Sequence, residues 1–106
     1  MSSELFYKLR LEMRRGALVV VVLARLRTDQ YGYALRKDLD RQGIAVEEST
    51  LYPLLRRLES RGLLVSKWRE EHQKKKRFYR HTPDGRVMLR RLLVEWTRMS
   101  AALDPR

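Results

Sequence analysis

The chain of 106 residues contains no cysteine. That absence excludes disulfide bonds, thiolate metal sites and a cysteine nucleophile. Histidine is also scarce, with only His72 and His81 present. Two histidines without any cysteine make a poor ligand set for zinc, so we expect neither a metal site nor a cofactor.

Long apolar runs and catalytic motifs are missing as well. The longest apolar run, 17–24, is far shorter than the ~20 residues that a membrane-spanning helix needs. Glu4 and Glu12 lie near the start, which lacks the layout of a signal peptide. The sequence holds no glycine-rich phosphate loop, nucleophile elbow or zinc-protease motif. We therefore expect a cytoplasmic protein that has no membrane partner and is not an enzyme.

The composition favours a folded domain with a polyanionic partner. Hydrophobic residues make up 43% of the chain and charged residues 35%, and the length fits one domain. Lysine and arginine number 24 against 13 acidic residues, which gives a net charge of +11. Such an excess suits DNA, RNA or an acidic membrane surface. It is greatest in residues 63–81, whereas residues 47–62 are neutral.

Residues 4–27 are predicted to form the first helix, with Ser3 as its N-cap. Four consecutive valines, 19–22, favour a strand by propensity. Apolar residues at helical spacing continue on both sides of the valines, and this pattern favours a helix. Gly16 marks a place where the helix could kink, so the continuity of its two halves stays open.

Two further helices are predicted in the middle of the chain. The first spans residues 30–41 and ends before Gly43. The second spans 47–61 and ends at Gly62. Proline is tolerated near the first turn of a helix, so Pro53 predicts a start at Glu48 or Ser49. The apolar stripe of this second helix has the spacing i, i+3, i+4, i+7, and its members are Leu51, Leu54, Leu55 and Leu58.

The last third of the chain combines a hairpin with a helix. Residues 63–70 and 76–82 alternate with period two, which predicts two strands joined by a loose, basic loop over 71–75. Trp68 and Tyr79 are expected to pack in the core beneath the hairpin. Thr82 is a plausible N-cap for a long amphipathic helix that runs to the end of the chain. Because no later element can cover this helix, a second subunit is a reasonable partner.

The order of these elements predicts a mainly α fold with a small β-hairpin, as in a winged helix-turn-helix. Residues 1–81 would form the DNA-binding domain, with a recognition helix at about 48–61 and a wing at about 63–81. Residues 82–106 would form a C-terminal dimerisation helix. A helix fits the major groove of DNA, and a basic hairpin can contact the adjacent phosphates.

Several motifs in this order resemble the PadR-like family of bacterial transcriptional regulators. The similarity covers nearly the whole chain and matches a compact branch with a single C-terminal helix. His81 and the absence of glycine from the wing tip depart from the family pattern. The matching stretches are Tyr31-Gly32-Tyr33, Thr50-Leu51-Tyr52-Pro53-Leu54-Leu55-Arg56-Arg57-Leu58-Glu59, Ser66-Lys67-Trp68, Arg77-Phe78-Tyr79-Arg80 and Thr82-Pro83-Asp84-Gly85.

The resemblance implies a homodimer in which the last helix packs on the partner's first helix. It also implies a repressor that binds a pseudo-palindromic operator in double-stranded DNA and is released by a small aromatic effector. Trp96 matches a tryptophan that lines the effector site in some relatives. The residues expected at the dimer interface are Leu9, Met13, Leu89, Leu92, Leu93, Trp96, Met99 and Leu103.

Candidate DNA contacts lie on the predicted recognition helix and wing. Glu48 and Ser49 are expected to face bases, and Thr50 and Tyr52 to contact phosphates near the helix N-terminus. The full set is Glu48, Ser49, Thr50, Tyr52, Arg56, Arg57, Lys74, Lys75, Lys76 and Arg77. A small basic RNA-binding protein is the alternative, although RNA recognition usually needs exposed aromatic residues on a sheet.

Overall fold

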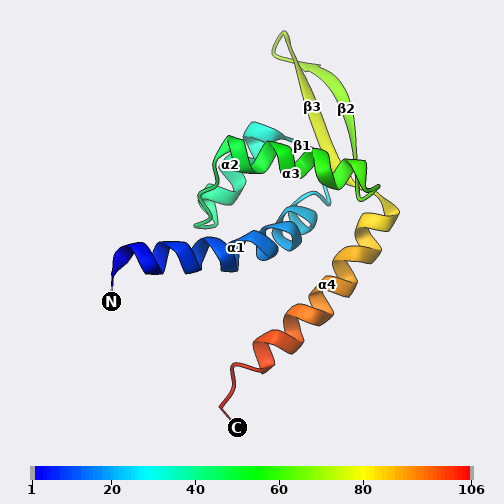
Figure 1. Ribbon diagram of the computed structural model, residues 1–106. Helices are drawn as coiled ribbons and strands as arrows, with labels where there is room; N and C mark the ends of the chain where they lie inside the picture. Colours follow the sequence, from blue (N-terminus) through cyan, green and yellow to red (C-terminus); the bar gives the residue numbers. More distant parts are fainter. Residues whose placement is uncertain (1, 106) are drawn as a thin grey trace.

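The computed structural model describes residues 2–105 and is mainly helical with a small antiparallel sheet (Figure 1). The predicted fold class is therefore confirmed. Along the chain, the elements are α1 (Ser3–Arg25), β1 (Gln30–Tyr31), α2 (Gly32–Arg41), α3 (Glu48–Ser60), β2 (Leu64–Glu71), β3 (Lys74–His81) and α4 (Pro83–Ala101).

Helix α1 is continuous through Gly16 and the four valines. Its N-cap is Ser2 rather than Ser3, because the Ser2 hydroxyl accepts a hydrogen bond of 3.1 Å from the Leu5 amide. The valine segment is helical because α1 buries Leu18 and Val22 in the core, and such packing outweighs strand propensity. None of the helices within residues 2–105 combines the length and apolar character needed to cross a membrane.

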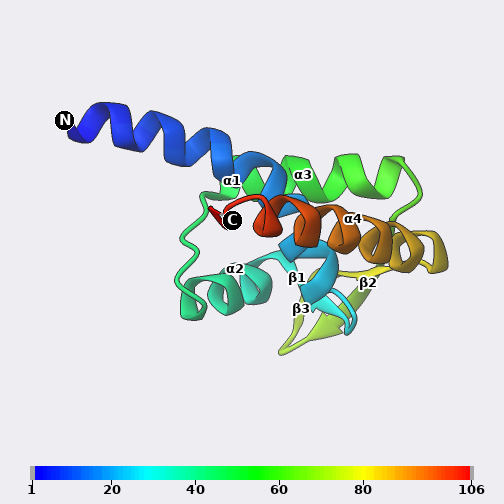
Figure 2. The same ribbon diagram turned by 90° about the horizontal axis from the view of Figure 1, so that it is seen from below.

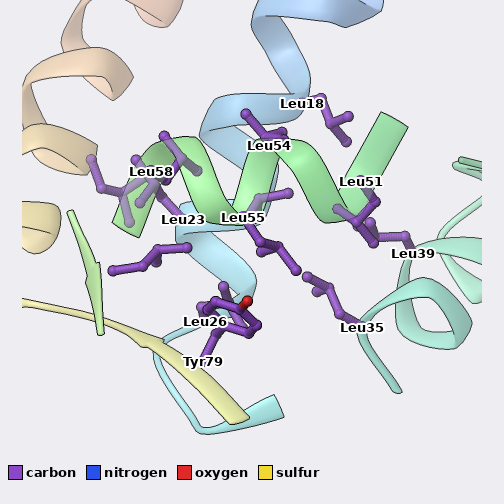
Figure 3. Close-up of a cluster of buried hydrophobic side chains, with 13 residues drawn as sticks. Leu18, Leu23, Leu26, Leu35, Leu39, Leu51, Leu54, Leu55, Leu58 and Tyr79 are labelled. Carbon is purple, nitrogen blue, oxygen red and sulfur yellow. The ribbon is translucent and has the colours of Figure 1, made fainter. Parts of the chain in front are cut away.

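The core is built mainly of leucine and lies between α1, α2, α3 and the base of the sheet (Figure 3). Helix α3 contributes the four leucines of its predicted stripe, and all four are buried. The stripe fixes the rotation of α3, so that its opposite side faces solvent. The other buried members of the cluster are Leu18, Val22, Leu23, Leu26, Leu35, Leu39, Leu64, Tyr79 and Leu89.

The sheet has three strands in the order β1-β3-β2. Residues 30–31, predicted as the start of a helix, are instead a short strand in which Gln30 lies opposite Tyr79 and Tyr31 opposite Phe78. Pairing with β3 satisfies backbone groups that a helix start would leave unpaired. The hairpin is therefore anchored to the segment that leads into α2.

The tip of the hairpin is tight, so the predicted loose loop over 71–75 is wrong. Strand pairing continues to Glu71 opposite Lys74, and only His72 and Gln73 form the turn. Both turn residues have positive φ, 53° and 66°, which is the conformation that two-residue hairpin turns require. Near the tip, Lys76 on β3 forms an ion pair of 3.8 Å with Glu71 on β2, which favours the extended ladder.

Helix α4 begins against the base of β2. The Thr82 hydroxyl caps the helix by accepting a 3.0 Å hydrogen bond from the Gly85 amide, and it donates a 2.6 Å bond to the Gly62 carbonyl. A methyl group at Gly85 would collide with the Leu63 carbonyl oxygen, so only glycine permits this approach. Farther along, α4 runs away from the core, and its end lies on the same side as the N-terminal half of α1 (Figures 1 and 2).

Candidate nucleic-acid interface

The solvent-facing side of α3 carries a polar stripe. Ser49, Tyr52, Arg56 and Glu59 are spaced by three or four residues and therefore share one face of the helix. The N-terminal part of this face borders a shallow, open depression of about 600 Å³. The residues that line the depression are Arg36, Glu47, Glu48, Ser49, Tyr52, Pro53 and Arg56.

Tyr52 connects α3 to the start of α2. A Cβ atom at Gly32 would lie within 2.5 Å of Tyr52 Cε1, so the glycine leaves space for the tyrosine ring. Tyr52 is half-buried against the core. The contact explains why the two motifs around Gly32 and Tyr52 occur together, and it fixes the N-terminus of α3 relative to α2.

At the start of α3, Arg36 of α2 binds polar groups, and Pro53 leaves one helix carbonyl without a partner in the helix. The Arg36 guanidinium forms an ion pair of 2.9 Å with Glu48 and donates a 3.3 Å hydrogen bond to the Val46 carbonyl. Helix α3 begins at Glu48, as the position of Pro53 predicted, and Pro53 lies in its second turn. Because proline has no N–H, the Ser49 carbonyl loses its partner within the helix and remains available as an acceptor.

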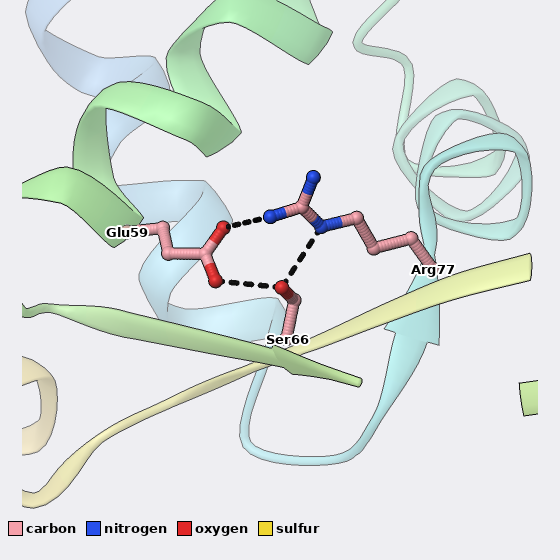
Figure 4. A network of polar contacts seen from close by, with 3 residues as sticks. All are labelled: Glu59, Ser66 and Arg77. Atoms are coloured by element: carbon pink, nitrogen blue, oxygen red, sulfur yellow. Dashed lines mark hydrogen bonds and ion pairs between the residues drawn. The ribbon is translucent and has the colours of Figure 1, made fainter. Parts of the chain in front are cut away.

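A three-residue network joins the last turn of α3 to the wing (Figure 4). The Arg77 guanidinium donates to one Glu59 oxygen at 2.8 Å and to the Ser66 hydroxyl at 2.9 Å. The Ser66 hydroxyl in turn donates to the other Glu59 oxygen at 2.6 Å. Charge-assisted bonds of this kind are strong when partly desolvated. The network therefore holds the hairpin at a defined angle to α3.

On the face of the wing that turns away from α3, the basic side chains contact an aspartate and two aromatic rings. Arg69 and Arg80 lie 3.6 and 3.9 Å from the Asp29 carboxylate. The Arg69 guanidinium also lies 3.7 Å from the ring centroid of Phe78, and Lys76 lies 4.3 Å from that of Tyr31. These cation–π and ionic contacts tie the wing to the segment that precedes α2.

Three wing lysines have no such partner. Lys67, Lys74 and Lys75 are exposed and lie in no ion pair or cation–π contact among residues 2–105. Arg56 and Arg57 on α3 are likewise exposed without an acidic partner in this part of the chain. These five side chains are the cations on α3 and the wing that are open to a polyanion.

Tyr79 lies where the wing meets α3. Burial raises the pKa of the Tyr79 phenol above its ordinary value of 10.0, and the nearby Glu59 carboxylate acts in the same direction. The Arg77 and Arg56 guanidinium groups oppose this rise in the pKa. Tyr79 therefore stays neutral at physiological pH. Since Glu59 bonds to Arg77, the stripe on α3 reaches the base of the wing.

Residues 19–91 match the family described as "Transcriptional regulator PadR-like family". The chain belongs to this family. It is 41% identical over 91 residues to the transcriptional regulator Rv3488 of Mycobacterium tuberculosis, an alignment that covers 82% of this chain and 85% of that protein. Its fold matches the crystal structure of a PadR family transcriptional regulator from Eggerthella lenta with a TM-score of 0.89 and 44% identity, covering 94% and 89% of the two chains.

A more distant structure is that of Bacillus subtilis PadR in complex with operator DNA. It superposes with a TM-score of 0.67 at 24% identity, covering 74% of this chain and 46% of that one. At this level of identity the likeness shows a shared fold. Together the comparisons confirm the predicted resemblance and identify the chain as a PadR-family transcriptional regulator.

The predicted DNA contacts of this PadR-like regulator fall into two groups. Tyr52, Lys76 and Arg77 are half-buried and already engaged in contacts within the protomer. Lys67 was not predicted, although the alternating pattern could have placed it on the surface. The remaining predicted contacts are exposed, namely Glu48, Ser49, Thr50, Arg56, Arg57, Lys74 and Lys75.

The two aromatic residues predicted to pack beneath the hairpin differ. Tyr79 is buried, as predicted, but Trp68 is 64% exposed, so the prediction for Trp68 is wrong. Both residues are on the face of the sheet that turns toward α3. The hairpin extends beyond the last turn of α3, and therefore no element within residues 2–105 covers the part of this face nearer the tip.

The residues predicted for the dimer interface are mostly available for contact. Leu92 is half-buried against the core. Leu89 is only 3% exposed in the protomer, so it belongs to the protomer's own core and cannot meet a partner. The exposed members of the predicted set are Leu9, Met13, Leu93, Trp96, Met99 and Leu103.

Proposed function

We propose that this PadR-family regulator binds duplex DNA in a sequence-specific manner, with α3 in the major groove and the wing on neighbouring phosphates. The observation that carries the proposal is a continuous surface. The polar stripe of α3 leads through Glu59 and Arg77 to the wing, where the exposed Lys75 lies on the same face and Lys74 lies next to it at the tip. Such a surface combines groups that can read base edges with cations that bind the backbone.

Each part of the surface has a distinct role in this proposal. Glu48 and Ser49, in the first turn of α3, face base edges, while Thr50 and Tyr52 contact phosphates. Lys74 and Lys75 contribute sequence-independent affinity by releasing counterions from the backbone. The single exposed aromatic residue of the hairpin, Trp68, does not make the multi-aromatic platform typical of RNA-binding sheets, so duplex DNA is favoured over RNA.

The dimer in this proposal is formed by the ends of α1 and α4. Met13 on α1 and Met99 on α4 are exposed, as are other apolar side chains of the same segments. A second copy would remove this apolar surface from water, and a twofold dimer would match a pseudo-palindromic operator. Sedimentation velocity tests this part, and a monomer at micromolar concentration would contradict it.

Repression and its release complete the proposal. A dimer that occupies a promoter excludes polymerase, and a flat aromatic effector that stacks on Trp96 at the dimer interface would change the spacing of the two recognition helices. Trp96 is 46% exposed in the protomer, which leaves room for such a ligand. In the Trp68→Phe variant, Trp96 is the only tryptophan, and its quenching by flat aromatic compounds tests the site. Unchanged fluorescence with a panel of such compounds would contradict it.

Fluorescence anisotropy with labelled duplexes tests DNA binding directly. The duplex upstream of the protein's own gene is compared with a shuffled duplex of the same composition and with duplex RNA. We expect tighter binding to the upstream DNA and, for ~6–10 phosphate contacts, a loss of roughly three to five decades in affinity between 50 and 200 mM salt. Equal binding to upstream and shuffled DNA, or displacement of the DNA by RNA, would refute the proposal.

A further inference from the structure

Trp68 is a large apolar side chain that is exposed to solvent on the wing. It is 64% exposed on the wing, at a position where every second residue of β2 turns toward α3. Leu64, at the base of this series, is buried in the core, and Ser66 bonds to Glu59 of α3. Trp68 is the next residue of the series, so its ring lies on the α3 side of the wing just beyond the junction.

Arg77 packs next to the Trp68 ring. Arg77 is the cross-strand partner of Trp68, and its guanidinium lies 5.9 Å from the centroid of the Trp68 ring. Because Arg77 is itself bonded to Glu59 and Ser66, the ring rests on a fixed support rather than on a mobile side chain (Figure 4). Lys75, two residues nearer the tip on the same face, is exposed and unpaired within residues 2–105.

Charge and position together indicate what occupies this site. The polar stripe of α3 ends at Glu59, and the wing begins where Arg77 meets that residue. With α3 in the major groove, a DNA strand at the edge of that groove must therefore pass the contact between Glu59 and Arg77 before it reaches the wing tip. Exposed cations lie to either side of the junction, with Arg56 one helical turn before Glu59 on α3 and Lys75 toward the tip of the wing, and they suit the phosphates of such a strand.

We propose that Trp68 packs its indole ring against a deoxyribose of the strand that crosses from α3 to the wing. The apolar C–H surface of the sugar covers the exposed ring, and the indole N–H donates a hydrogen bond to the adjacent phosphate. The contact recognises the backbone and not the bases, so it acts on any duplex. This inference rests on the proposed DNA-binding function.

A second copy of the protein is a poorer occupant for this site. The exposed apolar residues that a dimer would cover are on α1 and α4, and the wing projects from the opposite end of the molecule from both termini (Figure 1). Lys75, the exposed cation nearer the tip on the same face, would also meet its own copy in a symmetric contact between two wings.

Acrylamide quenching measures the exposure of Trp68 directly. The Trp96→Phe variant leaves Trp68 as the only tryptophan, and acrylamide is neutral, so the charge of the DNA does not repel it. With a saturating 30-base-pair duplex, either upstream or shuffled, we expect the quenching constant of Trp68 to fall about threefold or more. The matched control is Trp68→Phe, in which Trp96 reports and its quenching should not change on binding.

Affinity provides a second, independent measurement. Trp68→Ala should weaken binding to upstream and shuffled duplexes by the same factor, on the order of tenfold per protomer for one buried aromatic contact. Trp68→Phe keeps an apolar ring but loses the N–H donor, so its affinity should lie between that of Trp68→Ala and that of the wild type. Val65→Ala, on the opposite face of the same strand, is the matched control and should bind like the wild type.

The outcomes separate this inference from the function on which it rests. If anisotropy shows no binding to any duplex, both the proposed function and the role of Trp68 are refuted. If the duplex binds while the quenching constant of Trp68 stays unchanged, only the role of Trp68 is refuted. A loss of affinity confined to the upstream duplex would also overturn it, because a backbone contact must act equally on both sequences.

Discussion

The seven basic residues of the wing belong to two groups that differ in their surroundings. Four have an acidic or aromatic partner in the protomer, and three are exposed without one in the described part of the chain. Residues of the same type therefore either hold the wing in place or face solvent, and a charge count cannot separate them. The partnered group is Arg69, Lys76, Arg77 and Arg80, and the open group is Lys67, Lys74 and Lys75.

The largest expected effect comes from the open group. In the Lys74→Ala/Lys75→Ala variant, a dimer loses four cations, and the slope of log affinity against log salt should fall by about 0.9 for each lost phosphate contact. Affinity for every duplex should drop by about two to three decades at 0.15 M salt. The free energy of unfolding should change little. Titrations at several salt concentrations measure the slope.

Two exposed cations of α1, Lys8 and Arg15, supply the matched control. Their double alanine variant removes the same charge from the other end of the molecule, and its salt slope should equal that of the wild type. An equal loss of slope in both variants would mean that total charge, rather than the wing lysines, sets the affinity.

Alanine substitutions in the partnered group should lower the free energy of unfolding, and the substitution of Arg77 should lower it most. Arg77→Ala leaves the Glu59 carboxylate partly buried without its cation, and we expect the free energy of unfolding to fall by about 2 kcal/mol. Arg77→Lys should recover only part of this loss because lysine lacks the planar fork of arginine. Urea denaturation of the single variants and of Arg77→Ala/Glu59→Ala gives the coupling energy. Strictly additive losses would show that the two residues do not act as a pair.

The smallest expected effect concerns Arg69 on the face of the wing that turns away from α3. Arg69→Ala removes the cation over the Phe78 ring and a long ion pair with Asp29, both half-exposed, so the loss should be about 0.5–1 kcal/mol. Urea denaturation measures this loss, and Lys67→Ala, a neighbouring position in the open group, should change the free energy of unfolding hardly at all. If Lys67→Ala destabilised the protein as much as Arg69→Ala, the division into two groups would be wrong.

Much of the fold could be predicted because local patterns agreed with the packing. The leucine spacing of α3 marks one buried face, and the alternation of β2 and β3 marks two strands, so these elements formed as predicted except at the tip of the hairpin. Strand β1 escaped prediction, since two residues carry no periodicity and become a strand only by pairing with β3. The tight tip escaped as well, because His72 and Gln73 are not typical of a turn with positive φ.

The candidate site could be predicted in its residue types but not in its partners. Glu59 and Arg77 are 18 residues apart, and Asp29 lies much farther still from the arginines it contacts. Such pairs follow from the angle between the wing and α3, which no local pattern encodes. Trp68 was assigned to the correct face by its alternation. Its exposure depends on where α3 ends relative to the hairpin, and this is a tertiary property.

The close approach of Gly85 to the Leu63 carbonyl makes α4 and the wing one mechanical part. Thr82 reinforces this joint, since its hydroxyl donates to Gly62 and its amide donates to the Leu63 carbonyl at 3.1 Å. A rotation of α4 about its first turn would therefore carry the start of β2 with it. Residues 62–63 are therefore the pivot about which α4 and the wing would move together.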